Sequence, residues 1–285
     1  MLEFFHALQD PNFFFLRYAL AAGILASIAL GIVGTYVVTR RITYIAGAIA
    51  HCVLGGIGAG LYLQINRGWT WCHPMYGAVA SALAAAVIIG LVSLYARQRE
   101  DTVIGALWAV GMAVGLLFIA KTRGNTDPIA MSYLFGDILL ISAGDLWGIA
   151  ALDALVVAVG VLFHHKFLAL CFDEEFTQLR GVRVKSYYLL LLCLTALTVV
   201  LLVRVVGIVM VIALLTLPAA VAGHFSRRLW QMMALAVLCC ALFITAGLAL
   251  SYAPDLPPGP VIIVIAAAVY LAVAIGSRVL RRRSA

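Results

Sequence analysis

The sequence predicts an all-α protein, a polytopic transmembrane helical bundle of about eight or nine spans. Of its 285 residues, 65% are hydrophobic and only 11% are charged, whereas a soluble globular domain is about half apolar and a quarter charged. Several apolar runs reach or approach the roughly 20 residues that a helix needs to cross a bilayer. These observations exclude an ordinary soluble enzyme and indicate one membrane domain over residues 1–285.

Charged or aromatic residues bound each of the first four spans. We expect these spans at residues 13–39, 44–64, 76–95 and 102–120. The first ends at Arg40 and Arg41. The loop after the second contains Trp69 and Trp71, and tryptophan favours the membrane–water interface. Two arginines and an acidic pair follow the third span, and Lys121 follows the fourth.

The second half of the chain contains five further spans. We expect them at residues 145–163, 187–203, 208–221, 229–252 and 261–277. Arg204 and Gly207 separate the sixth span from the seventh, and a proline-rich loop separates the last two because proline cannot continue a helix. The apolar stretch 129–144 is short and fits an interfacial or re-entrant segment better than a full span. The longest polar stretch, residues 164–186, contains a short surface helix expected at Phe172–Gly181.

Basic residues orient these spans. They cluster on alternate loops, namely those at residues 40–41, 97–99, 164–186 and 227–228, and at the C-terminal residues 281–283. The positive-inside rule assigns these loops to the cytoplasm, so we expect an inner-membrane protein with a cytoplasmic C-terminus. Lys121 and Arg123 are the main exception. The net charge of +7 therefore reflects membrane topology, and we expect lipid but no nucleic acid as a partner.

Motifs for enzymatic chemistry are missing. The sequence has no G-x-x-x-x-G-K-[ST] motif for ATP, no H-E-x-x-H and no G-x-S-x-G. Its six cysteines form no C-x-x-C pair, which favours packing over a redox or zinc-finger role. We therefore expect a transport subunit without an ATPase site of its own and without a permanently bound cofactor.

Two ionisable residues inside spans are candidate site residues. His51 lies eleven residues past Arg40, about 16 Å along a helix, which is near the middle of a bilayer. An ionisable group at that depth indicates a functional site, and neutral imidazole is a common ligand for zinc and related metals. A histidine that only packs and forms a hydrogen bond is equally compatible with the spacing. Asp153 in the fifth span could be a metal ligand, a counter-charge for Arg204 or a structural polar contact.

Two further histidines are weaker candidates. His224 lies near the cytoplasmic end of the seventh span beside Arg227, which favours a surface role. His73 lies in an expected outside loop, where it could help to receive a cation, although a solvated loop histidine is the simpler reading.

Six segments in order resemble the membrane permeases of ABC importers for zinc, manganese and related divalent metals. The first is R-R-I-T-Y-I-A-G-A-I-A-H-C-V-L-G-G at residues 40–56, and the fourth is F-D-E-E-F-T-Q-L-R-G-V-R-V at residues 172–184. The other four are at residues 100–115, 133–146, 206–222 and 247–252. The segments extend from the end of the first span to the eighth.

This resemblance implies a fold like that of vitamin and metal importer permeases, working as a homodimer. It further implies two ATPase subunits on the cytoplasmic face and a metal-binding receptor outside. The polar loop 164–186 would contain the coupling helix that enters the ATPase. Its expected contact residues are Phe172, Asp173, Glu174, Glu175, Phe176 and Gly181.

One position departs from the family pattern. The family has an aspartate one helical turn before the histidine, whereas this sequence has Gly47 four residues before His51. An Asp/His pair at this spacing would share one helix face. Because a hard carboxylate ligand is missing, the sequence favours zinc over manganese or iron. The missing carboxylate is also compatible with two His51 side chains that face each other across a dimer.

Two alternatives remain open from the sequence. An ion-coupled secondary transporter could use His51 and Asp153 as a proton relay. A permease of the same architecture could instead carry a metal chelate or a vitamin, through a path that is wider and less dependent on His51.

Overall fold

The computed structural model describes residues 14–69, 71–95, 100–124, 132–136, 138, 141–172, 178, 181, 183–252, 254 and 256–283. Within these residues all regular structure is helical. The helices are α2 (Phe14–Thr39), α3 (Thr43–Asn66), α4 (Pro74–Tyr95), α5 (Glu100–Lys121), α7 (Ala143–Leu162), α8 (His164–Phe172), α10 (Val184–Val206), α11 (Ile208–Phe225), α12 (Leu229–Tyr252) and α13 (Pro258–Arg283).

In the part of the chain that the structure describes, nine of these helices are long and apolar enough to cross a membrane. They correspond one to one with the expected spans, which confirms the all-α transmembrane bundle. Boundaries differ by a few residues, and α13 begins earlier than expected, at Pro258, because proline is tolerated in the first turn of a helix. In the described part of 129–144, the structure has one helical turn at residues 132–135.

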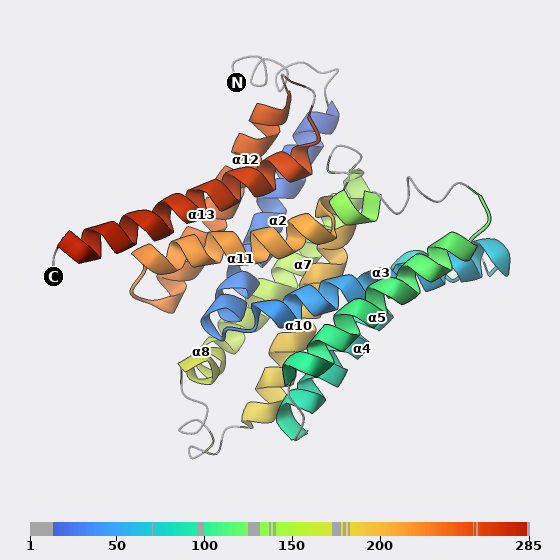
Figure 1. Cartoon of the computed structure of the whole chain (residues 1–285), viewed down its shortest axis with the longest axis horizontal. Coiled ribbons are helices and arrows are strands. Elements are labelled where there is room, and N and C mark those ends of the chain that lie inside the picture. Colours follow the sequence, from blue (N-terminus) through green and yellow to red (C-terminus); the bar gives the residue numbers. More distant parts are fainter. Residues whose placement is uncertain are drawn as a thin grey trace.

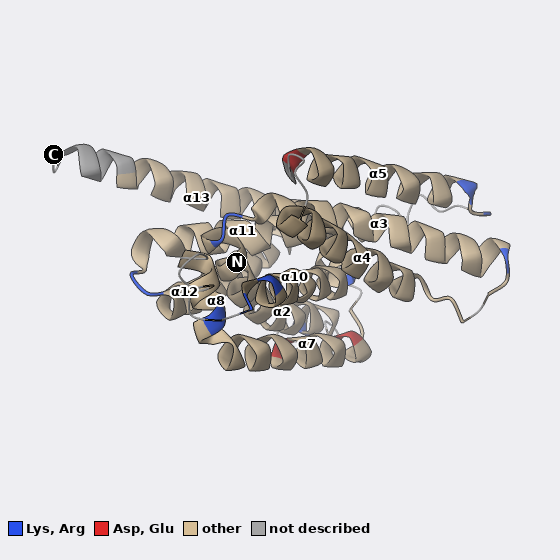
Figure 2. Cartoon of the chain, turned by 90° about the horizontal axis from the view of Figure 1, so that it is seen from below, with Lys and Arg blue, Asp and Glu red and all other residues tan. Residues whose placement is uncertain are grey.

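The helices form two groups that α10 connects. On one side α3 packs against α4 and α5, and on the other α2 packs against α7, α11 and α12, with α13 against α11 and α12. Helix α10 contacts members of both groups. In Figure 2, α5 and α13 lie along one side of the molecule and α7 lies along the opposite side. The two candidate residues on α3 and α7 therefore belong to different parts of the bundle.

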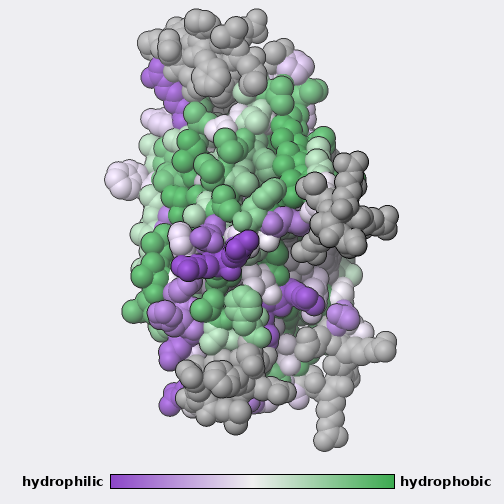
Figure 3. All heavy atoms as spheres, turned by 90° about the vertical axis from the view of Figure 1, so that its left-hand side faces the viewer, coloured by the Kyte–Doolittle hydropathy of each residue, from purple (hydrophilic) through white to green (hydrophobic). Residues whose placement is uncertain are grey.

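Among the described residues, charged side chains lie mostly near the ends of the helices, and Asp153 in the middle of α7 is an exception. Figure 2 shows Lys and Arg mostly near helix ends and in the connecting segments. In Figure 3, the upper half of the visible face is almost continuously hydrophobic, and hydrophilic side chains gather across its middle and lower part. This distribution is the one that a bilayer requires, because an ionised side chain at its centre is costly.

Close backbone contacts hold α3 against its two neighbours. A Cβ atom on Gly56 would meet the carbonyl oxygen of Gly77 on α4. On α5, a Cβ atom on Gly111 would lie 2.9 Å from the Cα of Cys52, and one on Gly115 would lie 2.6 Å from the carbonyl carbon of Leu54. The small residues spaced four apart in α3 and α5 thus pack helices within one chain.

The turn between α2 and α3 is a Schellman motif with an arginine in place of the usual glycine. The N–H of Ile42 donates to the carbonyl of Val37, and the N–H of Arg41 donates to that of Val38. Arg41 has a φ of 61°, in the left-handed region that favours glycine. The motif ends α2 and starts α3 within three residues, and it thereby determines which residues of α3 face its neighbours.

Two glycines let a loop cross the junction of α10 and α11. Gly136 and Gly207 have φ values of 77° and 83°. A Cβ atom on either one would overlap backbone atoms at the other. The segment before α7 is therefore held against the break between α10 and α11.

Candidate functional site

His51 lies well inside α3, eight residues after the helix begins and thus about 12 Å along it. Its side chain is half-buried, and its Nδ1 lies 2.9 Å from the carbonyl oxygen of Gly47. Since a carbonyl only accepts, Nδ1–H must donate, and the neutral ring keeps its lone pair on Nε2. The hydrogen bond therefore selects the tautomer in which Nε2 can bind a metal.

Trp108 on α5 covers the imidazole. The two rings are stacked, with centroids 4.5 Å apart and planes 30° from parallel. The same indole lies against Gly47, where a Cβ atom would be 2.9 Å from Cη2 and Cζ3 of Trp108. Gly47 thus provides the space that the indole occupies beside His51.

The close packing of α5 on α3 explains why Trp108 reaches this position. Trp108, Gly111 and Gly115 are spaced i, i+3 and i+7, so they share one face of α5. The two glycines bring the α5 backbone against α3, and the large side chain one turn earlier then meets His51. The sequence interpretation missed Trp108, and the glycine at position 47 was the signal that could have indicated a bulky neighbour.

The site offers one metal ligand and an aromatic face. Among the residues that the structure describes, no group of three or more His, Cys, Asp or Glu side chains could hold a metal ion. A structural zinc site needs four ligands, so this site is unlike one. The arrangement leaves Nε2 of one imidazole, whose ring is stacked on an indole, as the donor atom of this site.

Asp153 belongs to a different part of the bundle. It is 6% exposed on α7, and its Oδ1 accepts a hydrogen bond of 3.1 Å from the N–H of Ala29 on α2. Its Oδ2 has no hydrogen-bond partner among the described residues. Arg204 does not pair with Asp153 but lies 3.2 Å from Asp145, at the start of α7. The proposed counter-charge role of Asp153 is thus wrong, and the observed contact is structural.

The two weaker candidates both contact local backbone. Nδ1 of His73 accepts a hydrogen bond of 3.2 Å from the N–H of Met75, in the first turn of α4. Nδ1 of His224 lies 2.9 Å from the carbonyl of Ala220, one turn back in α11, and its side chain is exposed. Among the described residues, neither histidine belongs to a group of three or more side chains that could hold a metal ion.

The expected coupling segment is described only in part. Phe172 is the last residue of α8 and is 71% exposed, and Gly181 has a φ of 74°. Asp173, Glu174, Glu175 and Phe176 lie outside the described residues. Helix α8 follows α7 after a single residue, Phe163, so the polar stretch 164–186 begins with a helix that the sequence interpretation did not expect.

Comparisons with known proteins agree on one family. A model of the ABC 3 transport family matches residues 12–277. A Chlamydia muridarum protein named "Probable metal transport system membrane protein" is 40% identical over 95% of this chain and 90% of its own length. The manganese import system permease protein ScaB of Streptococcus parasanguinis is 32% identical over 94% of this chain and 92% of its own. The solved structure of PsaBC from Streptococcus pneumoniae in complex with Fab has a TM-score of 0.82 and 29% identity, covering 95% and 94% of the two chains.

Proposed function

The chain belongs to the ABC 3 transport family, and on that premise we propose that it is the membrane permease subunit through which an ATP-binding cassette importer moves a divalent metal ion into the cytoplasm. The observation that carries this proposal is His51, whose Nε2 is left free for a metal inside a span. The names of relatives that span nearly the whole chain also refer to metal transport.

In this proposal His51 lines the translocation path and binds the passing ion briefly. A neutral imidazole can release its ligand readily when it is the only protein ligand, and the stacked indole holds the ring in place. The Gly47 carbonyl adds a second constraint, because it fixes the tautomer. The chain's own residues thus orient one donor atom and leave the ion free to move on.

We propose zinc as the favoured ion, ahead of manganese and iron. Imidazole suits zinc, whereas manganese favours carboxylate and water oxygens. At the turn before His51 this chain has Gly47, so no carboxylate shares that face with the histidine. The name of the S. parasanguinis relative refers to manganese, which makes the choice of ion the first property to measure.

Power for transport would come from partner subunits. We propose that two ATPase subunits dock on a homodimer of this chain through residues 172–181, which begin at the last residue of α8. A metal-binding receptor would deliver the ion from outside, and the C-terminus would lie in the cytoplasm. Alternating access would then be driven by ATP binding and hydrolysis on those subunits.

A proton relay between His51 and Asp153 has no support in the geometry. His51 faces Trp108 on α5, whereas Asp153 faces Ala29 on α2. Helices α5 and α7 lie on opposite sides of the molecule in Figure 2. A relay would need an unbroken chain of polar groups between them.

The test is uptake of radioactive zinc, manganese and iron by the complete complex in liposomes. We expect His51→Ala to abolish uptake while the complex still assembles, as judged by gel filtration. His224→Ala is a matched control that also removes a histidine bonded to the carbonyl four residues back, and it should transport normally. Normal uptake by an assembled His51→Ala complex would overturn the proposal.

A further inference from the structure

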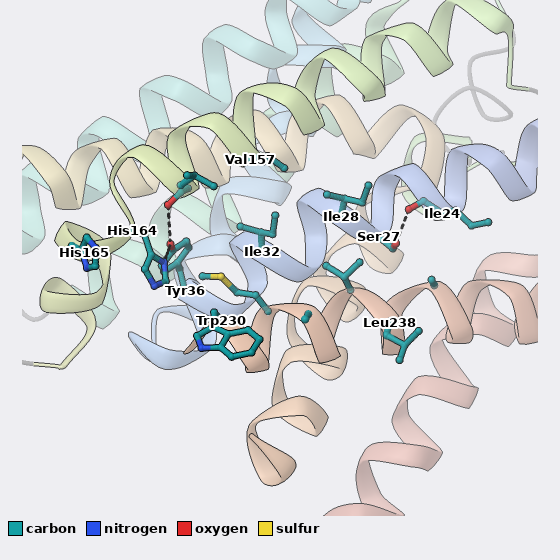
Figure 4. Close-up of a pocket in the computed structure, with 16 residues that line it drawn as sticks. Ile24, Ser27, Ile28, Ile32, Tyr36, Val157, His164, His165, Trp230 and Leu238 are labelled. Carbon is teal, nitrogen blue, oxygen red and sulfur yellow. Dashed lines mark hydrogen bonds between the residues drawn. The ribbon is translucent and has the colours of Figure 1, made fainter. Parts of the chain in front are cut away.

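A long apolar groove lies away from His51, on the outer side of α2, α7 and α12. Its volume is about 910 Å³. Figure 4 shows its walls, with Ile28 and Ile32 on α2, Val157 on α7 and Leu238 on α12. None of the sixteen lining residues is Asp, Glu, Lys or Arg. Most of the lining is aliphatic, so the groove complements a ligand that is mainly apolar.

The groove has the length of one membrane leaflet. Along α2 its lining runs from Ile24 to Tyr36, and twelve residues of helix advance about 18 Å. Half of the bilayer hydrocarbon core is about 15 Å thick. The groove follows helices that cross the membrane, so it runs with the acyl chains of one leaflet and not across them.

One end of the groove is more polar than the other, where the one hydroxyl group, that of Ser27, donates to the carbonyl of Ile24. At one end, Figure 4 groups Tyr36, His164, His165 and Trp230, whereas Ile24 and Leu238 lie toward the other. The hydroxyl of Tyr36 lies 3.3 Å from Nδ1 of His164. Both His165 and Trp230 are exposed, and tryptophan marks the interface of a membrane.

Positive charge gathers beside this polar end. Arg227 and Arg228 precede Trp230 in the loop before α12, whereas Lys166, next to His165 in α8, lines a different pocket with Phe163 and Arg183. The side chains of Arg227 and Arg228 are exposed. Lysine and arginine at the membrane surface attract anionic lipid headgroups. The polar end thus complements a phosphate, and the rest of the groove complements a hydrocarbon chain.

We propose that this groove is a binding site for an anionic phospholipid of the leaflet next to the loop between α11 and α12. One acyl chain lies along α2 between α7 and α12, and the phosphate lies between His165, Trp230 and the neighbouring basic residues. The occupied groove joins α2 and α12 to α8, the helix that leads into residues 172–181. A bound lipid would therefore stabilise the side of the protein from which this segment extends.

The test is photo-crosslinking in nanodiscs of the complete complex, with phosphatidylglycerol that has a diazirine in one acyl chain. We expect mass spectrometry to find the lipid on peptides of α2 and α12. The double variant Ala234→Leu, Ala241→Leu fills the groove from α12 and should lower this crosslinking at least tenfold. Ala84→Leu, at an exposed alanine on α4 outside the groove lining, is the matched control and should change nothing.

A second variant tests the headgroup. Arg227→Gln with Arg228→Gln should remove the preference for phosphatidylglycerol over phosphatidylcholine probes but leave crosslinking by the neutral probe unchanged. Equal crosslinking by the two probes in the wild-type complex would overturn the proposal, as would undiminished crosslinking in the filled variant. Crosslinks from the groove to a second copy of the chain would also overturn it, since a protein would then occupy the site.

Discussion

Replacing Gly47 by aspartate would restore the carboxylate of the family pattern, yet we expect it to damage this protein. The new Cβ alone would lie 2.9 Å from two ring carbons of Trp108, before any carboxylate is placed. The indole cannot yield easily, because it is also stacked on the imidazole of His51. Overpacking of this kind costs about 1–3 kcal/mol. A loss of about 2 kcal/mol lowers the melting temperature by roughly 4–8 °C in a domain of 150–250 residues.

The assay is thermal unfolding of the purified complex, paired with metal uptake. Gly47→Asp should lower Tm by several degrees and reduce uptake of zinc. Gly105→Ala is the matched control on α5, because a Cβ atom there meets nothing within 4 Å, and it should leave Tm unchanged or raise it.

The double variant Gly47→Asp, Trp108→Ala separates packing from chemistry. Removing the indole opens the space that the carboxylate needs, so we expect Tm to recover in part relative to Gly47→Asp. Aspartate and histidine would then lie on one face of α3, and uptake should shift from zinc toward manganese. A Gly47→Asp variant with unchanged Tm and unchanged uptake would refute the packing of Gly47 against Trp108.

Three further predictions concern other parts of the bundle. Arg41→Gly should raise the free energy of unfolding by about 1 kcal/mol, because the left-handed φ of 61° strains a residue that has a Cβ atom. The measurement is an increase in Tm, and a lower Tm would show that the arginine side chain stabilises the protein by more than the strain destabilises it. Burial raises the pKa of the Cys171 thiol to about 11. The rate of maleimide labelling of Cys171 should therefore be low at pH 7 and rise about tenfold per pH unit toward pH 10. Fast labelling at pH 7 would contradict the raised pKa. Asp153→Asn keeps an acceptor for the N–H of Ala29, so uptake should stay within about twofold of wild type, whereas loss of uptake with normal assembly would show that the carboxylate is needed for transport.

Much of the fold could be predicted because the bilayer constrains the length and the composition of each membrane-spanning helix. Span length follows from the thickness of the hydrocarbon core, and breaks follow from arginine pairs and prolines, so α12 begins and ends at the expected residues. Helix α8 was not expected, because its nine residues combine two histidines and a lysine with apolar residues and resemble a loop. The Schellman turn at Arg41 was also hidden, since the usual sign is a glycine.

The candidate site was only half predictable for a related reason. His51 was visible because an imidazole inside an apolar run is unusual by itself. Trp108 was not, because a tryptophan in an apolar helix is unremarkable until the contact between α3 and α5 is known. The role of Asp153 likewise depended on which helix faces α7, and the sequence does not specify that α2 does.

Gly47 and Trp108 are best understood as one unit. A glycine in the middle of a helix destabilises it by about 0.5–1 kcal/mol relative to alanine, so its presence in α3 needs a compensating contact. The indole supplies that contact, because it fills the space beside Gly47 and stacks on His51. A larger residue at position 47 would overlap the indole, and a smaller residue at position 108 would leave a cavity. The absence of a carboxylate at position 47 therefore depends on the presence of Trp108. If His51 lines the path, the passing ion meets an imidazole held by an aromatic ring instead of an imidazole and a carboxylate, which disfavours ions that require oxygen ligands.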